Sequence, residues 1–179
     1  IVNVLFGYGP FSYKDVTMTS DALTFFGYGV IAFALVKILA NFFFARDNTK
    51  TPFYISLLIV FLNILISIVF FNKIGFLIIP IATSFSTWIG VLIYFYLLKK
   101  HNFLLLQSKI LNNLLKIIIA TVVMSIALVF ALSKYSNYLE YNYYYKSIYL
   151  LLIVGFVGIV YLLFCYLLGL LKIKNYKTN

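Results

Sequence analysis

The chain has 179 residues, of which 64% are hydrophobic and only 10% are charged. Soluble domains are about 45–50% apolar and about 25% charged, so the composition excludes a water-soluble domain and indicates a polytopic membrane protein. The net charge of +10 is not gathered on a soluble basic face, so nucleic acid is not an expected partner.

The apolar segments predict helices. They are continuous, whereas the strands of a membrane barrel alternate apolar and polar residues. Backbone groups within lipid must satisfy one another, which leaves only helices or closed barrels. We therefore predict an all-α, polytopic transmembrane bundle in a single domain, with helices at about residues 13–45, 52–71, 74–98, 110–132 and 147–171.

The first predicted helix has a recognisable start. The stretch GYGP interrupts the chain, and Ser12 followed by Asp15 fits a capping box. Polar first turns then lead into an apolar run from Ala22 to Ala45. The chain opens on Ile1 in an apolar stretch without a basic region or cleavage site, so we expect no signal peptide and an upstream part of the protein.

Lys37 lies inside this apolar run, nine residues before Arg46 and therefore about 13 Å from it along the helix. Its stem reaches only about 6 Å, so the ammonium stays below the membrane interface. A charge there costs about 2.5–3.5 kcal/mol. Lys37 either snorkels through a thinned bilayer or faces a cavity or partner, and we favour the second explanation. Asn41, one turn later, shares its face.

No acidic partner for Lys37 is expected within the spans, because the four acidic residues lie in or beside connections. The turn that follows the first helix reads RDNTKTP and runs from Arg46 to Pro52. Thr51–Pro52 is an ordinary helix start, since Pro suits the first turn.

Lysine distribution predicts the orientation. One alternating set of connections holds nine cations: Arg46, Lys50, Lys99, Lys100, Lys109, Lys116, Lys172, Lys174 and Lys177. The other set holds four: Lys14, Lys73, Lys134 and Lys146. The positive-inside rule places the richer set in the cytoplasm, with the N-terminal end outside and the C-terminus inside.

Tyrosines mark the fourth connection and suggest either an aromatic belt at the membrane interface or a surface on which glycans stack. They are Tyr135, Tyr138, Tyr141, Tyr143, Tyr144 and Tyr145.

The sequence contains few side chains that could act as a catalytic nucleophile, a base or a metal ligand. His101 is the only histidine and lies in a basic loop, Cys165 is a lone apolar thiol, and Ser84 and Ser86 have no base at a useful spacing. We therefore expect these serines to bond a backbone carbonyl or a neighbouring helix, and we expect no enzyme, metal or cofactor. Four glycines mark candidate positions of close helix approach: Gly27, Gly29, Gly155 and Gly158.

Three blocks, LFGYGPFSYKD, LVKILANFFFARDNTKTP and IATSFSTW, carry a resemblance to the MurJ (MviN) family of lipid II flippases, within the multidrug/oligosaccharidyl-lipid/polysaccharide exporter superfamily. The matching positions are Leu5, Phe6, Gly9, Phe11, Ser12, Asp15, Val36, Lys37, Leu39, Ala40, Phe43, Arg46, Thr49, Lys50, Thr51, Pro52, Ala82, Thr83, Ser84 and Trp88. The chain departs from the family pattern at Asn41, where Pro is usual, at Phe44, where Tyr is common, and in the order of Asp47 and Asn48.

The resemblance implies that this chain is the C-terminal part of a fourteen-helix flippase and supplies helices ten to fourteen of its second lobe. The family moves lipid II, the lipid-linked peptidoglycan precursor, across the bacterial inner membrane by alternating access. Its partners would be lipid II, membrane lipids and the first lobe, and the groove between the last two helices would take the polyprenyl tail. The turn after the first helix would be a cytoplasmic gate element that connects two helices, more than a ligand site. Its candidate residues are Arg46, Asp47, Thr49, Lys50, Thr51 and Pro52. The coupling ion, sodium or proton, is left open.

Three other interpretations remain. A sister exporter of polyprenyl-linked O-antigen units would share the fold. A membrane enzyme of lipid-glycan synthesis would need acidic residues at fixed spacing in or beside the spans, which the chain lacks. A truncated, non-transporting remnant would lack an upstream partner.

Overall fold

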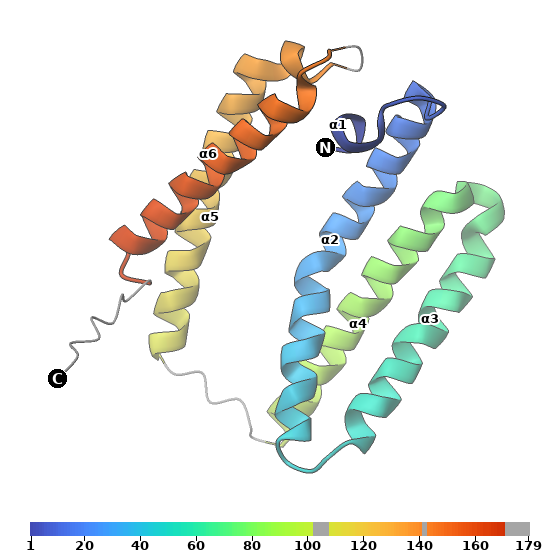
Figure 1. Ribbon diagram of the computed structural model, residues 1–179. Helices are drawn as coiled ribbons and strands as arrows, with labels where there is room; N and C mark the ends of the chain where they lie inside the picture. Colours follow the sequence, from blue (N-terminus) through green and yellow to red (C-terminus); the bar gives the residue numbers. More distant parts are fainter. Residues whose placement is uncertain (102–107, 141–142, 171–179) are drawn as a thin grey trace. The chain divides into compact units, whose positions relative to one another are not determined.

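The computed structural model describes residues 1–101, 108–140 and 143–170, and within these ranges it is built of helices and short connections (Figure 1). In chain order the elements are α1 (Val2–Phe6), α2 (Tyr13–Phe44), α3 (Lys50–Ile74), η1 (Gly75–Leu77), α4 (Ile78–Lys100), α5 (Ser108–Tyr135), η2 (Ser136–Leu139) and α6 (Lys146–Leu167).

Four helical runs are long and apolar enough to cross a membrane: Tyr13–Phe44, Lys50–Lys100, Leu111–Leu139 and Lys146–Leu167. The second run contains both α3 and α4, which lie side by side after a reversal (Figure 1). The predicted class, an all-α polytopic helical bundle, is confirmed. Tyr141, Lys172, Lys174 and Lys177 lie outside the described residues, and the side chain of Lys109 is not described.

The start of α2 confirms the capping box. The Ser12 backbone N–H donates to Asp15 Oδ2 at 2.9 Å, and the Ser12 hydroxyl donates to the same oxygen at 2.6 Å. The Asp15 N–H donates back to Ser12 Oγ at 3.3 Å. These bonds satisfy groups that a helix start leaves open, which is why a 32-residue helix can begin at Tyr13. The short helix α1 before it was not predicted.

The predicted helices at about 52–71 and 74–98 left Asn72 and Lys73 as the reversal between them, but in the structure the reversal between α3 and α4 lies at Gly75. Asn72 and Lys73 belong to the last turn of α3, which continues through Ile74. Gly75 has φ 73°, a left-handed conformation that glycine adopts without steric cost. Gly75 lies between apolar residues, whereas Asn72 and Lys73 are polar and therefore gave the stronger turn signal in the sequence.

The chain divides into two compact units. Unit 1 comprises Ile1–Val16 and Leu106–Asn179 and contains α1, α5 and α6. Unit 2 comprises Thr17–Leu105 and contains most of α2 together with α3 and α4.

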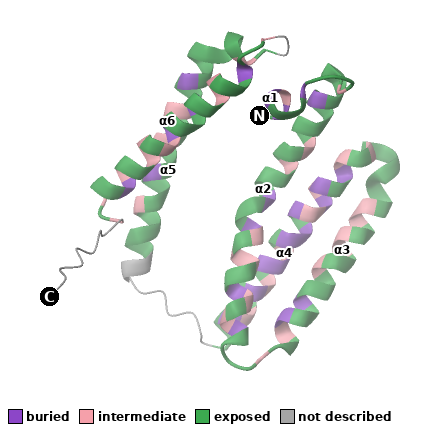
Figure 2. Ribbon diagram, viewed as in Figure 1, coloured by how far each residue is buried: buried purple, intermediate pink, exposed green. Residues whose placement is uncertain are grey.

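In unit 2, α4 is the central helix. It has ten buried residues, whereas α3 buries only Pro52 and Ile55 (Figure 2). The core of the unit joins side chains of all three helices, and the rings of Phe43 and Tyr94 lie 5.7 Å apart. Most large apolar side chains remain exposed, for example Ile68 at 71%, as expected for a surface that faces lipid.

Polar contacts tie α4 to both neighbours. The Ser84 hydroxyl donates to the Phe25 carbonyl of α2 at 2.7 Å, and Trp88 Nε1 donates to the Tyr28 carbonyl at 3.0 Å. On the other side, Asn63 Nδ2 of α3 donates to Thr83 Oγ1 at 2.9 Å. The block IATSFSTW is therefore an assembly motif in this structure.

The serine expectation is confirmed: Ser84 bonds the neighbouring helix, and the Ser86 hydroxyl donates to the Thr83 carbonyl of its own helix at 3.2 Å.

The glycine predictions have mixed outcomes. At Gly29 a Cβ would collide with the Ser84 side chain, so the predicted close approach is confirmed. A Cβ at Gly27, Gly155 or Gly158 would meet nothing within 4 Å in the described structure, so close approach at these three glycines stays a prediction. Gly90, which the sequence did not single out, packs closely against Ile59 of α3. A single glycine in an apolar run does not reveal which way it faces.

In unit 1, α5 and α6 pack side by side around Ala131, Ile153 and Val157. Lys116 Nζ near the start of α5 donates to the Leu168 carbonyl after α6 at 2.8 Å. At the opposite end of the pair, Asn3 Nδ2 of α1 donates to the Leu139 carbonyl at 2.7 Å. The N-terminal segment is therefore bound to the last helices of the chain.

Lys146, counted above among the loop cations, is buried with 1% of its surface exposed. Its ammonium donates to the Gly7 carbonyl at 2.9 Å and lies 4.1 Å from the centre of the Tyr8 ring. The Tyr8 hydroxyl in turn shares a hydrogen bond with Ser147 Oγ at 3.0 Å. A buried ammonium requires such partners, so Lys146 fixes the segment around Gly7 onto the start of α6.

We expect Lys146→Met, which keeps most of the length of the side chain and removes its charge, to release this segment. Loss of a charge-assisted hydrogen bond corresponds to at least about tenfold faster exchange of the backbone amides around Gly7. Hydrogen–deuterium exchange of the purified protein measures this rate. Lys73→Met, at the exposed end of α3, is the control. Unchanged exchange in Lys146→Met would contradict the role assigned to Lys146.

We expect Ser84→Ala to lower the free energy of unfolding by about 0.6 kcal/mol, and by at most about 1.7 kcal/mol, because interhelical hydrogen bonds in membranes have this magnitude. Ser125→Ala is the matched control, since the Ser125 hydroxyl donates only to the Thr121 carbonyl of its own helix. Denaturant unfolding in detergent compares the two variants. Equal destabilisation would show that the bond to α2 contributes nothing specific.

Candidate functional site

Each unit contains a cavity. The first, here called the α2–α3 cavity, has a volume of about 680 Å³ and lies within unit 2. Its wall includes Lys37 of α2, Thr49 and Lys50 at the start of α3, and Tyr94 of α4. The second, here called the α5–α6 cavity, has a volume of about 510 Å³ and lies within unit 1.

Lys37 is exposed on the surface of unit 2 and lines the α2–α3 cavity. It lies seven residues before the end of α2 at Phe44, about 10 Å along the helix. Val36, Ala40 and Phe44 form the apolar wall around it. Asn41, one turn later on α2, is also exposed but does not line the cavity, so only Lys37 of this pair contributes to its wall.

The turn after α2 is a Schellman motif. The Asp47 N–H donates to the Phe44 carbonyl at 3.0 Å, and the Asn48 N–H donates to the Phe43 carbonyl at 3.1 Å. Asp47 occupies the left-handed position of this motif with φ 54°. Asp and Asn tolerate this region better than most residues, which suits the DN order of this chain.

The predicted gate residues divide into two groups. Arg46 is bound to α2, since its Nη1 donates to the Phe42 carbonyl at 3.1 Å and its guanidinium lies 3.8 Å from the centre of the Phe42 ring. The Thr51 N–H is taken by Asn48 Oδ1 at 3.1 Å. Thr49, Lys50 and Pro52 line the α2–α3 cavity, whereas Arg46, Asp47 and Thr51 do not. A gating role for this turn stays a prediction.

Electrostatically, the α2–α3 cavity is cationic. Lys37 and Lys50 line it, and no acidic residue does so among the described residues. Lys50 is also the first residue of α3, where the helix dipole places partial positive charge. The cavity can therefore attract an anion.

Tyr94 was missed by the sequence analysis. It is fully buried and lines the cavity, and its hydroxyl has no hydrogen-bond partner in the described structure. One tyrosine in an aromatic-rich helix has no distinguishing sequence signal. Its position four residues after Gly90, on the same helix face, becomes informative only once the packing is known.

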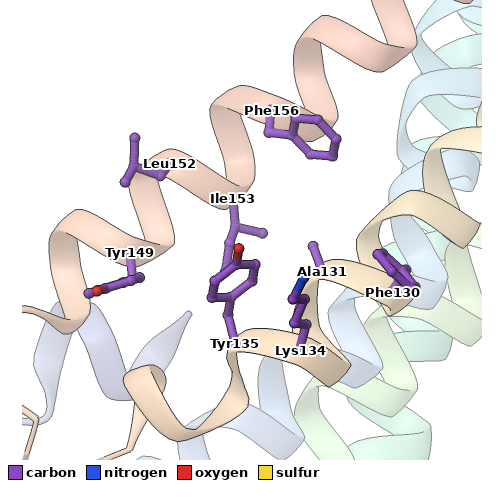
Figure 3. Close-up of a pocket in the computed structure, with 8 residues that line it drawn as sticks. All are labelled: Phe130, Ala131, Lys134, Tyr135, Tyr149, Leu152, Ile153 and Phe156. Atoms are coloured by element: carbon purple, nitrogen blue, oxygen red, sulfur yellow. The ribbon is translucent and has the colours of Figure 1, made fainter.

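The α5–α6 cavity is apolar and aromatic (Figure 3). Phe130, Ala131, Lys134 and Tyr135 line it from α5, and Tyr149, Leu152, Ile153 and Phe156 line it from α6. Lys134 is its one cationic side chain among these residues. The arrangement suits an extended hydrocarbon chain between two helices.

Tyrosines at this end of unit 1 contact one another. Tyr138 stacks on Tyr149 with ring centres 4.6 Å apart, and Tyr143 meets Tyr138 edge-on at 5.4 Å. Burial among these rings, together with the neighbouring Tyr149, raises the pKa of Tyr143. Tyr144, in contrast, is 85% exposed. Part of the predicted belt is therefore a packed cluster, and the choice between belt and glycan surface stays open.

The side chains that line the two cavities are suited to binding a ligand. The described residues include no group of three His, Cys, Asp or Glu side chains placed to hold a metal ion. One cavity presents cations beside apolar walls, and the other presents apolar and aromatic walls.

Comparisons with known proteins agree on one family. The family model described as "Lipid II flippase MurJ" matches residues 1–151. A relative from Rickettsia prowazekii, named "Probable lipid II flippase MurJ", is 34% identical over 184 residues, which covers 100% of this chain and 35% of the relative. A relative of the same name from Buchnera aphidicola subsp. Baizongia pistaciae is 32% identical over 181 residues, or 99% of this chain and 35% of the relative.

The chain thus spans about a third of the length of the curated relatives that it matches. The model match covers well over half of the chain, including the capped start of α2, Lys37 and the Schellman turn. On this basis the chain belongs to the MurJ family of lipid II flippases.

Proposed function

We propose that the full-length protein carrying this chain translocates lipid II across the bacterial inner membrane for peptidoglycan synthesis. The observation that carries the proposal is the family match over residues 1–151, with relatives that are named probable lipid II flippases. The two units would contribute helices of the second lobe, and the first lobe would complete the transport path by alternating access.

A lipid-linked diphosphate cannot cross about 30 Å of hydrocarbon unaided, so its path requires cations and water. Lys37 supports the proposal because it is a cation in an apolar helix and lines a cavity. We infer that Lys37 lies beside the path of the anionic headgroup. The turn from Arg46 to Pro52 would then be a connecting gate element near the same cavity.

The lipid tail needs a separate, apolar environment. The α5–α6 cavity supports this part of the proposal, since its wall is formed by aliphatic and aromatic side chains of two helices. We infer that a segment of the polyprenyl tail occupies it while the headgroup moves.

The orientation is part of the proposal. The lysine distribution places the turn after α2 and the C-terminus on the cytoplasmic side, and the N-terminal end on the periplasmic side. Lys146 contributes little to this bias, because its ammonium is buried and bound. We further propose that transport involves no catalytic residue and no cofactor, with sodium or proton as the candidate coupling ion.

The names of the relatives favour lipid II over O-antigen units as the cargo. The experiment that tests the function is complementation of a strain depleted of its own lipid II flippase. The full-length gene should restore growth and rod or coccal shape, and failure despite normal membrane expression would overturn the proposed function.

In the same assay we expect Lys37→Ala to reduce rescue strongly, because the headgroup loses a charge-assisted contact, which corresponds to at least about tenfold in headgroup affinity. Lys73→Ala, at the far end of α3, should rescue like the wild type. Unimpaired rescue by Lys37→Ala at equal expression would remove Lys37 from the path and leave the transport function standing.

We expect Leu152→Asn to weaken binding of a polyprenyl diphosphate about tenfold, since it removes an apolar contact of roughly 1.5 kcal/mol from the α5–α6 cavity. Leu151→Asn is the matched control, because Leu151 is the adjacent residue, is exposed to a similar degree and does not line the cavity. Titration of the purified full-length protein measures both affinities. Equal affinities would show that the tail binds elsewhere.

A further inference from the structure

We propose that the α2–α3 cavity is a binding site for the phosphate group of a lipid headgroup, held by Lys37, Lys50 and the hydroxyl of Tyr94. The three groups come from three helices of unit 2, and all of them line one cavity of about 680 Å³. The inference concerns binding alone and stands whichever lipid the protein transports.

The cations give the site its charge selectivity. Lys37 lies inside α2 and Lys50 is the first residue of the next helix, α3, and both line this cavity. No acidic side chain lines it to neutralise them. The positive end of the α3 dipole adds to the same field, and phosphate groups commonly bind where a helix begins.

Tyr94 is a second indication of a ligand, independent of the two lysines. Its side chain has 0% exposed surface, and its hydroxyl is one of two buried side-chain polar atoms without a partner in the described structure. Contact with Phe43, at 5.7 Å between ring centres, holds the ring in place. A buried hydroxyl without a partner is unfavourable, and a phosphate oxygen in the cavity would accept its hydrogen bond.

The walls favour a lipid over free phosphate. Val36, Phe44 and Phe53 line the cavity next to the lysines, so an inorganic ion would leave apolar surface uncovered. A lipid presents a phosphate group and hydrocarbon in one molecule and can satisfy both parts of the wall.

The test uses purified, delipidated full-length protein in detergent. The apparent Kd is measured by titration with three probes: dioleoyl phosphatidylglycerol, dioleoylglycerol with the same chains but no phosphate, and inorganic phosphate. We expect phosphatidylglycerol to bind at least about tenfold more tightly than either of the others. Equal binding of dioleoylglycerol would overturn the phosphate site, and equal binding of inorganic phosphate would overturn the lipid as its ligand.

Variants locate the site. We expect Lys37→Ala combined with Lys50→Ala to weaken phosphatidylglycerol binding more than about tenfold, and Tyr94→Phe to weaken it about fivefold to tenfold. Lys73→Ala is the control, an exposed lysine at the opposite end of α3. Unchanged affinity in the double variant would place the bound lipid elsewhere and overturn the proposal.

Tyr94→Phe also separates binding from folding. If the hydroxyl had only a structural role, its removal would change the melting temperature of the lipid-free protein and leave lipid affinity unaltered. We expect the reverse: a lipid-free protein at least as stable as the wild type, because an unpartnered buried hydroxyl is gone, with a smaller stabilisation by phosphatidylglycerol. Loss of stability with unchanged affinity would overturn the assignment of Tyr94.

Discussion

The structure depends on one constraint: a polar group inside hydrocarbon must find its partner within the protein. The helices satisfy their own backbones, and the few polar side chains are then used between helices. Ser84 and Trp88 donate to carbonyls of α2, and Asn63 donates to Thr83. Because lipid provides no hydrophobic drive to bring helices together, such bonds and the close approach at Gly29 set which helix faces meet.

The candidate functional groups are those polar side chains that do not find a partner within the described protein. Lys146 is a buried cation with protein partners and holds structure together. Lys37 and Tyr94 instead line a cavity, and the Tyr94 hydroxyl has no hydrogen-bond partner among the described residues. An anionic lipid carries the groups that both of them require, so the transport proposal and the phosphate site rest on the same physical argument, applied to different stages of a lipid's contact with the protein.

Sequence reasoning predicted the features that depend on local chemistry or on composition. The all-α membrane class followed from continuous apolar runs, and the start of α2 followed from Ser12 and Asp15. It failed where the answer depends on which way a residue faces. Gly90 was overlooked because periodicity is lost when nearly every residue is apolar. Tyr94 and the burial of Lys146 depend on contacts between distant segments, and no spacing in the sequence encodes them.

The contact between Lys146 and Gly7 joins residues 139 positions apart in the chain. During synthesis the N-terminal segment therefore emerges long before α6 exists to receive it. The lysine must enter a buried position only when the glycine carbonyl and the Tyr8 ring are there to meet it, so this end of unit 1 closes as a late event of assembly. Until α6 is in place, the Gly7 carbonyl and the Tyr8 ring lack this partner, so one ammonium group links the N-terminal segment to the completion of the chain.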